Sequence, residues 1–426
     1  MPPIQDHPLR FQLVNELHAR PFPVLKAPCR AAYLAIKPER DAAARDRDLD
    51  RAHLKDLLDR YAAPPPEPGA THYFGPIGKH FLKWESHTEF VTYTIIGDGV
   101  AERPFEAETF GVFPEDWLAT APGVRITSAL IRVEESVDAA KIERRLDEWF
   151  VQESLAVSHV LDASAVIAGD FRLDAAGHMR FAVFVRPNCG ARRVGRIMQR
   201  LCEIETYKTM SMLGLTRSRE LGPRMGEIDQ ELTRLMRDMT GDEASPESTL
   251  EALLATSSEL ENLLAQTAFR FGATGAYEAL VTQRISVLRE ERFQGRQTFS
   301  EFMTRRYDPA MRTVKSTEAR LKAMSDRALR AGDLLRTRVD VERSAQNQTI
   351  LESMDRRADL QLRLQRTVEG LSVVAISYYA VNLVTYMVYP LIEPSGLSGG
   401  VAKALATPAV VVLVWLMVRR IRKTLH

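Results

Sequence analysis

Two apolar segments dominate the hydrophobic pattern of the chain. The first covers residues 371–392 and carries no formal charge. At about 1.5 Å per residue, its roughly 22 residues span the ~30 Å hydrocarbon core of a bilayer. The second covers residues 404–418 and reaches a full span when residues 397–403 are included. The stretch EPSGLSGG between them has turn chemistry. The pattern predicts a C-terminal two-helix transmembrane hairpin.

Basic residues flank both outer ends of this hairpin. They are Arg356, Arg357, Arg363 and Arg366 before it and Arg419, Arg420, Arg422 and Lys423 after it. The connecting loop carries only Glu393, so the positive-inside rule places both chain ends in the cytoplasm. Trp415 fits an aromatic anchor at the inner interface, beside the four basic residues that follow it. The alternative, a helical hairpin buried in a soluble core, agrees less well with apolar runs of this length.

The first span carries a polar face. Tyr378, Asn382, Thr385 and Tyr389 follow one another at spacings of four, three and four, which places them on one side of a helix. Polar groups facing lipid would remain unpaired, so this face should meet another helix or water. It either joins helices by hydrogen bonds or lines a conduction path. Both interpretations predict a homo-oligomer.

The segment before the first span is helical in period. Between residues 309 and 370 apolar positions recur mostly at spacings of three, four or seven, as in a coiled coil. One helix is expected to run from Pro309 into the membrane, over about 80 residues. Such a helix needs partners, and we expect them in residues 191–240, 247–266 and 276–306. Residues 241–248 form a turn, with Ser245 or Ser248 as a helix cap.

The first 190 residues have a different texture. Runs typical of strands cover residues 31–36, 89–96, 124–133, 160–169 and 178–187, and helical patterns cover 45–62 and 137–150. Their irregular alternation predicts a mixed α+β domain. The expected organisation is therefore a cytoplasmic α+β domain over residues 1–190, a long helical stalk over 191–370, and the transmembrane hairpin with its basic tail over 371–426.

Composition narrows the function classes. Lys and Arg total 57 against 56 Asp and Glu, so no charge excess points to nucleic acid. Cys29, Cys189 and Cys202 are too scattered for a disulfide framework or a zinc site, which favours a reducing cytoplasm. The N-terminal residues lack the apolar core of a signal peptide.

Candidate chemistry is sparse. No P-loop, GxGxxG, HExxH or GxSxG motif occurs, so the sequence predicts no enzyme and identifies no cofactor. His80 and His87, with Glu85 and Glu89, form the densest ligand-like group, but strand alternation separates the two histidines. We expect polar residues of an edge strand rather than a metal site. Glu16 and His18 end a short helix and do not face one another.

Four parts of the chain have a distinctive sequence: HPLRFQLVNELHARPFP (7–23), KWESHTEFVTYTIIGDG (83–99), YKTMSMLGL (207–215) and the terminal hairpin. They resemble one family of uncharacterised bacterial proteins that are expected to be membrane-anchored. The resemblance covers nearly the whole chain and implies a bacterial inner-membrane protein.

The architecture also resembles that of CorA-type divalent-cation channels, which are pentamers lined by the first span. Their Gly-Met-Asn signature is absent, because Met387 stands between Tyr386 and Val388. Two functions follow as expectations. One is a homo-oligomeric, CorA-like membrane protein that conducts or senses a cation, with a divalent cation as the implied ligand. The other is a membrane-anchored scaffold or regulator without transport activity.

Overall fold

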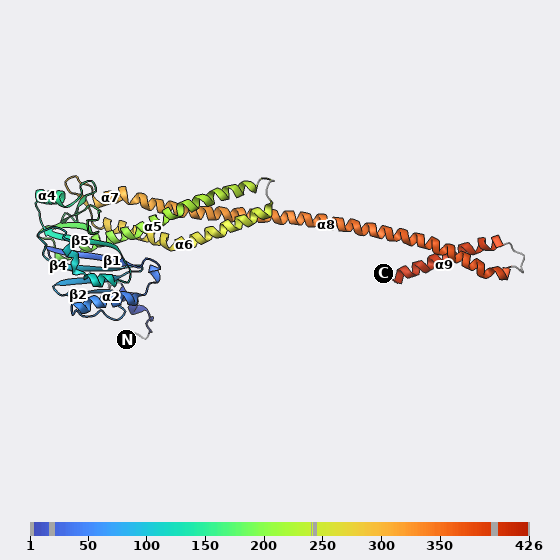
Figure 1. Ribbon diagram of the computed structural model, residues 1–426, viewed down its shortest axis with the longest axis horizontal. Coiled ribbons are helices and arrows are strands. Elements are labelled where there is room, and N and C mark those ends of the chain that lie inside the picture. The colour runs from blue at the N-terminus through green and yellow to red at the C-terminus, as the bar shows by residue number, and fades with distance from the viewer. Residues whose placement is uncertain (1–3, 17–21, 240, 242–244, 393–398, 425–426) are drawn as a thin grey trace. The chain divides into compact units, whose positions relative to one another are not determined.

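The computed structural model describes residues 4–16, 22–239, 241, 245–392 and 399–424 (Figure 1). Within these ranges, the side chains of residues 12, 15, 16, 107, 389–392, 399, 402 and 421–424 are not described. The helices are α1 (Arg10–Glu16), α2 (Arg47–Arg60), α3 (Glu115–Ala119), α4 (Ala139–Trp149), α5 (Ala191–Asp238), α6 (Pro246–Ser286), α7 (Phe299–Arg306), α8 (Asp308–Ile392) and α9 (Gly399–Thr424). Two 3₁₀ turns are η1 (Ala42–Ala44) and η2 (Ala107–Val112).

A mixed β-sheet organises the N-terminal region. Its strands are β1 (Cys29–Lys37), β2 (His72–Ile77), β3 (His80–Ser86), β4 (Val91–Asp98), β5 (Val124–Glu135), β6 (Ala156–Val160), β7 (Ala165–Gly169), β8 (Met179–Val185) and β9 (Glu291–Arg292). Among the described residues these nine strands lie in the order β2-β3-β4-β1-β5-β8-β7-β6-β9. The β5–β8 pair is parallel and the other pairs are antiparallel.

Alternation along the strands gives the sheet two covered faces. On one face, Leu34 of β1 and Tyr93 of β4 pack with Leu57 of α2 and Trp117 of α3. Further along the same face, α4 covers β6, β7 and β8. On the opposite face, β1, β5, β7 and β8 pack against α5, α6, α7 and the start of α8. The sheet is therefore the middle of three layers, which confirms the mixed α+β class.

The long helices are joined to one another by buried and charged contacts. Tyr307, just before α8, shares a hydrogen bond of 2.8 Å with Ser211 of α5. Asp229 of α5 pairs with Arg320 of α8 at 3.1 Å and also with Arg327. Most of the stability of a helix in a protein comes from packing of its apolar face, so these contacts and the shared apolar core hold the helices together.

The segment that precedes β1 lies directly against α5. The Leu25 N–H donates to the Ala191 carbonyl at 3.0 Å, and Pro23 is buried. A Cβ added to Gly195 would lie 1.7 Å from the Pro23 carbonyl oxygen. Only glycine allows the backbone of α5 to come this close to the segment.

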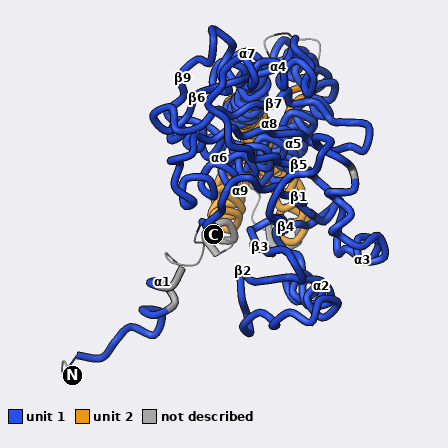
Figure 2. The backbone as a smooth tube through the Cα atoms, turned by 90° about the vertical axis from the view of Figure 1, so that its left-hand side faces the viewer, with its two compact units in different colours: residues 1–243, 251–331 blue, residues 244–250, 332–426 orange. Residues whose placement is uncertain are grey.

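The chain divides into two compact units (Figure 2). Unit 1 holds residues 1–243 and 251–331, which include the sheet, α5, α7 and most of α6. Unit 2 holds residues 244–250 and 332–426, which include most of α8 and α9. The 85-residue helix α8 begins at Asp308, beside the expected Pro309, so the prediction of one very long helix is confirmed.

Three local predictions differ from the structure. Residues 160–169 form two strands, because Leu161, Asp162 and Ala163 adopt positive φ in a tight turn without glycine. The gap expected between 266 and 276 is absent, because α6 is continuous. The helix expected over 276–306 is interrupted after Ser286 by β9 and a loop, and α7 restarts at the capping box of Thr298. At the other end of the turn after α5, Ser245 accepts from the Ser248 N–H at 3.2 Å, which confirms Ser245 as a cap of α6.

Candidate functional site

A polar layer lies between the sheet and α5. In β3 and β4, Leu82, Trp84 and Tyr93 belong to the apolar core of one face. Lys83 and Thr92 alternate with these apolar residues along the two strands. Their side chains are buried and line a pocket on the α5 side of the sheet. Strand alternation therefore places polar side chains under a helix, where each requires a hydrogen-bond partner.

These polar groups form a connected network. Lys83 Nζ donates to Gln199 Oε1 at 2.6 Å and pairs with Glu85 at 3.1 Å. Gln199 Nε2 in turn donates to Glu203 Oε1 at 2.8 Å, and Glu203 pairs with Arg284 of α6. The network holds two ion pairs, Lys83–Glu85 and Arg284–Glu203, linked through the neutral amide of Gln199, so each charge has an opposite partner.

The space inside this layer is small. The cavity measures about 20 Å³, which admits a water molecule but no organic ligand. Cys202 lines it, and burial raises the pKa of this thiol, so the nucleophilic thiolate is disfavoured. Tyr33 OH shares a 2.5 Å hydrogen bond with Thr206 Oγ1. The layer therefore fixes α5 on the sheet and presents no activated nucleophile.

A second buried carboxylate joins the β3–β4 turn to α6. Glu89 is 1% exposed, pairs with Arg270 and accepts a hydrogen bond of 3.0 Å from Tyr277 OH. Tyr277 stacks on Tyr207 of α5, with ring centroids 5.8 Å apart. The Glu89 carboxylate and the stacked tyrosines thus join the β3–β4 turn, α6 and α5.

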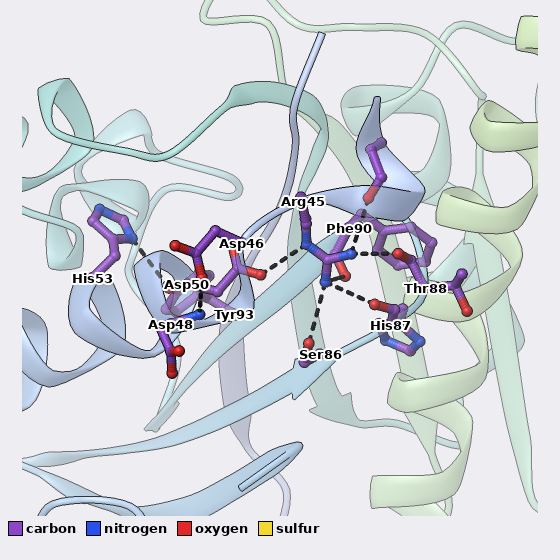
Figure 3. Close-up of polar contacts among 11 residues, drawn as sticks. Arg45, Asp46, Asp48, Asp50, His53, Ser86, His87, Thr88, Phe90 and Tyr93 are labelled. Atoms are coloured by element: carbon purple, nitrogen blue, oxygen red, sulfur yellow. Dashed lines mark hydrogen bonds and ion pairs between the residues drawn. The ribbon is translucent and has the colours of Figure 1, made fainter. Parts of the chain in front are cut away.

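On the α2 side, Arg45 and His53 occupy buried polar positions (Figure 3). Arg45 Nε donates to Asp50 Oδ2 at 2.7 Å, and its remaining N–H groups donate to carbonyls of the β3–β4 turn. His53 contacts Tyr93 OH at 3.1 Å and the Trp117 carbonyl at 3.0 Å. Burial lowers the pKa of His53, so the neutral imidazole is favoured. Both side chains stabilise the fold around α2.

The group of His80 and His87 with Glu85 and Glu89 does not form a metal site. In the part of the chain that the structure describes, no three His, Cys, Asp or Glu side chains are grouped to hold a metal ion. His80 begins β3 and His87 follows it. The expectation of an edge strand is wrong, because β3 pairs with both β2 and β4, and β2 forms the edge. Residue 18, the other histidine considered, lies outside the described residues.

The polar face expected in the first span lies on α8. Tyr378 is 66% exposed, while Asn382 and Thr385 are half-buried. Thr385 Oγ1 donates to the Val381 carbonyl of its own helix at 2.6 Å. The side chain of Tyr389 lies outside the described residues. The most buried positions here, Ser377 and Val381, lie on a neighbouring side of the helix, so the polar face is partly covered within the chain and Tyr378 remains exposed.

The expected interface residues lie near the end of α9. Trp415 is half-exposed, and the Arg419 guanidinium carbon lies 5.0 Å from its ring centroid. Arg420 is exposed, and the side chains of Arg422 and Lys423 lie outside the described residues. Among the described residues, one helix, Asp308–Val388, is long and apolar enough to cross a membrane by length and composition.

Sequence reasoning missed the polar layer and the role of Arg45. A signal was present, because the peptide KWESHTEFVTYTII alternates Trp84, Val91, Tyr93 and Ile95 with polar residues. This alternation reads as a strand with one solvent-exposed face. Only the three-dimensional structure reveals that α5 covers that face.

Comparison with known proteins gives one result. The model of the family described as "Protein of unknown function (DUF3422)" matches residues 5–425. No curated protein matches the chain. The family match agrees with the resemblance to an uncharacterised family and offers no support for a likeness to CorA-type channels.

Proposed function

The chain belongs to the DUF3422 family, and we propose that it is a homo-oligomeric integral membrane protein. In this proposal, α8 links a cytoplasmic α+β region to a two-helix transmembrane hairpin made of the end of α8 and α9. The apolar window of α8 supports the span, because only 11% of it is buried, whereas a core helix of a soluble protein would be mostly buried. The resemblance to membrane-anchored bacterial proteins supports the inner bacterial membrane, and the flanking arginines support an orientation with both ends of the hairpin cytoplasmic.

The exposed middle part of α8 is the observation that supports an oligomer. Between Arg343 and Val368 every residue of α8 is exposed, over about seven helical turns. Ile350, Met354, Leu364 and Val368 lie within about 40° of one line along this helix, and each is more than half exposed; Arg357 and Gln361 lie on the same side between the two apolar pairs. An isolated helix with an uncovered apolar stripe is marginal in water. Copies of α8 packing along this stripe would bury it.

Disruption of the stripe tests the oligomer. Substitution of Met354→Asp together with Leu364→Asp should convert the oligomer to a monomer in detergent, measured by light scattering coupled to size-exclusion chromatography. Two buried apolar side chains contribute about 3 kcal/mol per chain, so association should weaken at least a hundredfold. The matched control, Leu351→Asp with Leu362→Asp, adds the same charge on another side of the helix and should remain oligomeric. A monomeric wild-type chain would refute the proposal.

Within such an oligomer, the polar face of α8 suits a route for a hydrated cation. Tyr378, Asn382 and Thr385 offer hydroxyl and amide oxygens, and oxygen atoms are the ligands that hard cations prefer. Tyr378 is exposed within one chain, and Asn382 and Thr385 are only partly buried, so the face can still turn toward a common axis. We therefore propose that the oligomer conducts or senses a cation.

Ion flux tests conduction. Proteoliposomes holding a Mg²⁺-sensitive dye should report uptake through the wild-type chain, and Asn382→Leu should reduce the rate at least tenfold without changing the oligomeric state. Leu383→Ala, one position away and off the polar face, should conduct normally. Absence of wild-type flux for both Mg²⁺ and K⁺ would reject conduction and favour a membrane-anchored scaffold, in which the polar face only joins helices.

A further inference from the structure

A pocket of about 460 Å³ lies between α8 and α9 within unit 2. It is lined by Arg366, Glu369 and Gly370 of α8 and by Trp415 and Arg419 of α9, with one valine from each helix. Its volume falls in the range of small-molecule sites, and none of the preceding conclusions uses it.

The pocket has a polar part and an apolar part. Beside Gly370 the space is open, because a Cβ at this position would meet no atom within 4 Å. Val373, Val418 and the Trp415 ring supply apolar wall, while the charged groups come from the positions that precede the apolar segment of α8 and end that of α9. Such an arrangement suits an amphiphile with a charged head and an apolar tail.

The charged residues of the lining indicate which kind of headgroup the pocket would bind. Two arginines against one glutamate leave the lining with one net positive charge. The guanidinium of Arg419 lies over the Trp415 ring, which orients its planar donors. Guanidinium groups bind phosphate oxygens through paired N–H donors. Glu369, which accepts from Gln365 Nε2 at 3.1 Å, can accept from a hydroxyl or amine of the same head.

The position of the pocket along the helices selects its occupant. Arg366 precedes Leu371 by five residues, or about 7.5 Å of helix, and Arg419 follows Val418 directly. If the proposed spans are correct, both arginines lie at the depth of the cytoplasmic headgroups. We propose that this pocket binds the phosphate-bearing headgroup of an anionic phospholipid. The inference rests on the proposed membrane insertion.

Tryptophan fluorescence can measure this binding in the full chain. Trp84, Trp117 and Trp149 are buried in unit 1, so lipids brominated on their acyl chains should quench only Trp415. The chain is reconstituted in phosphatidylcholine vesicles that contain a minor fraction of brominated phosphatidylglycerol or, separately, of brominated phosphatidylcholine. Selective binding predicts that the anionic lipid has the higher apparent affinity for the Trp415 site. Trp415→Phe should abolish the quenching signal.

Variants separate the pocket from general charge. Arg366→Gln and Arg419→Gln should each reduce the preference for phosphatidylglycerol about fivefold. Gly370→Leu should also reduce it, by filling the pocket without changing the charge. The control Arg356→Gln with Arg357→Gln removes two charges about 14 Å further from the apolar segment than Arg366, beyond the Debye length, and should retain the preference.

The outcomes distinguish the proposed lipid site from membrane insertion and from binding of a soluble phosphate compound. A preference lost in the pocket variants and kept in the control supports the site. Equal quenching by the two brominated lipids overturns the site and leaves membrane insertion intact. Absence of quenching by either lipid overturns insertion itself. Displacement of the lipid by millimolar inorganic phosphate or glycerol phosphate would assign the site to a soluble phosphate compound and overturn the lipid proposal.

Discussion

Substitution of Arg45→Met should lower the free energy of unfolding by about 3–5 kcal/mol. Arg45 and Asp50 are both 4% exposed in their side chains, and their Nε–Oδ2 distance is 2.7 Å. Arg45 also donates to the carbonyls of His87 and Phe90, at 2.7 and 3.2 Å. Methionine keeps the apolar stem and leaves a buried carboxylate and turn carbonyls without their donor. Urea unfolding followed by tryptophan fluorescence, in the detergent used for purification, measures the loss.

Two variants test the cause of this loss. Lys55→Met removes a pair with Asp59 in which both side chains are more than half exposed, and should cost at most about 0.5 kcal/mol. Adding Asp50→Leu to Arg45→Met should recover part of the loss, because the uncompensated carboxylate is removed. Equal costs for Arg45→Met and Lys55→Met would contradict the role assigned to the buried pair.

Two glycine-to-alanine substitutions in α5 should change stability in opposite directions. Alanine at position 195 places a Cβ against the Pro23 carbonyl, so the segment before β1 must shift, at a cost of about 1–3 kcal/mol. Alanine at position 226 meets no atom within 4 Å and should stabilise the helix by about 0.5–1 kcal/mol.

The same urea titration compares the two variants. Because both substitutions add one methyl group to one helix, the difference between them isolates the contact with Pro23. Stabilisation by Gly195→Ala would show that the segment before β1 does not pack on α5 in solution.

The parts of the fold that follow from local patterns were predictable from the sequence. The long helix from Asp308 was expected because apolar spacing continues without a proline for about 80 residues after Pro309. The strands β1, β4, β5 and β8 lie where β-branched and aromatic runs predicted them. The fold departs from prediction where tertiary contacts override the pattern. The break after Ser286 allows Phe293 to be buried and β9 to pair with β6, and the charged sequence around it gives no sign of either.

The candidate sites could likewise be predicted where local spacing determines them, and could not be predicted where tertiary contacts do. Helical spacing alone places Tyr378, Asn382 and Thr385 on one side of α8. Spacing alone could not join Lys83 to Gln199, because the two residues lie 116 positions apart. It also could not find the pocket beside Trp415, whose lining comes from two helices.

The pairing of β9 with β6 has a consequence for how the chain folds. His159 meets Glu291, so this edge of the sheet closes only after α5 and α6 have been synthesised and have returned the chain to the sheet. Contacts of such sequence separation form slowly. Until they form, β6 is an open edge that can pair with other chains. A fragment that ends at residue 190 would keep that edge permanently unpaired, so aggregation of such a fragment would reflect a missing strand rather than an unstable core.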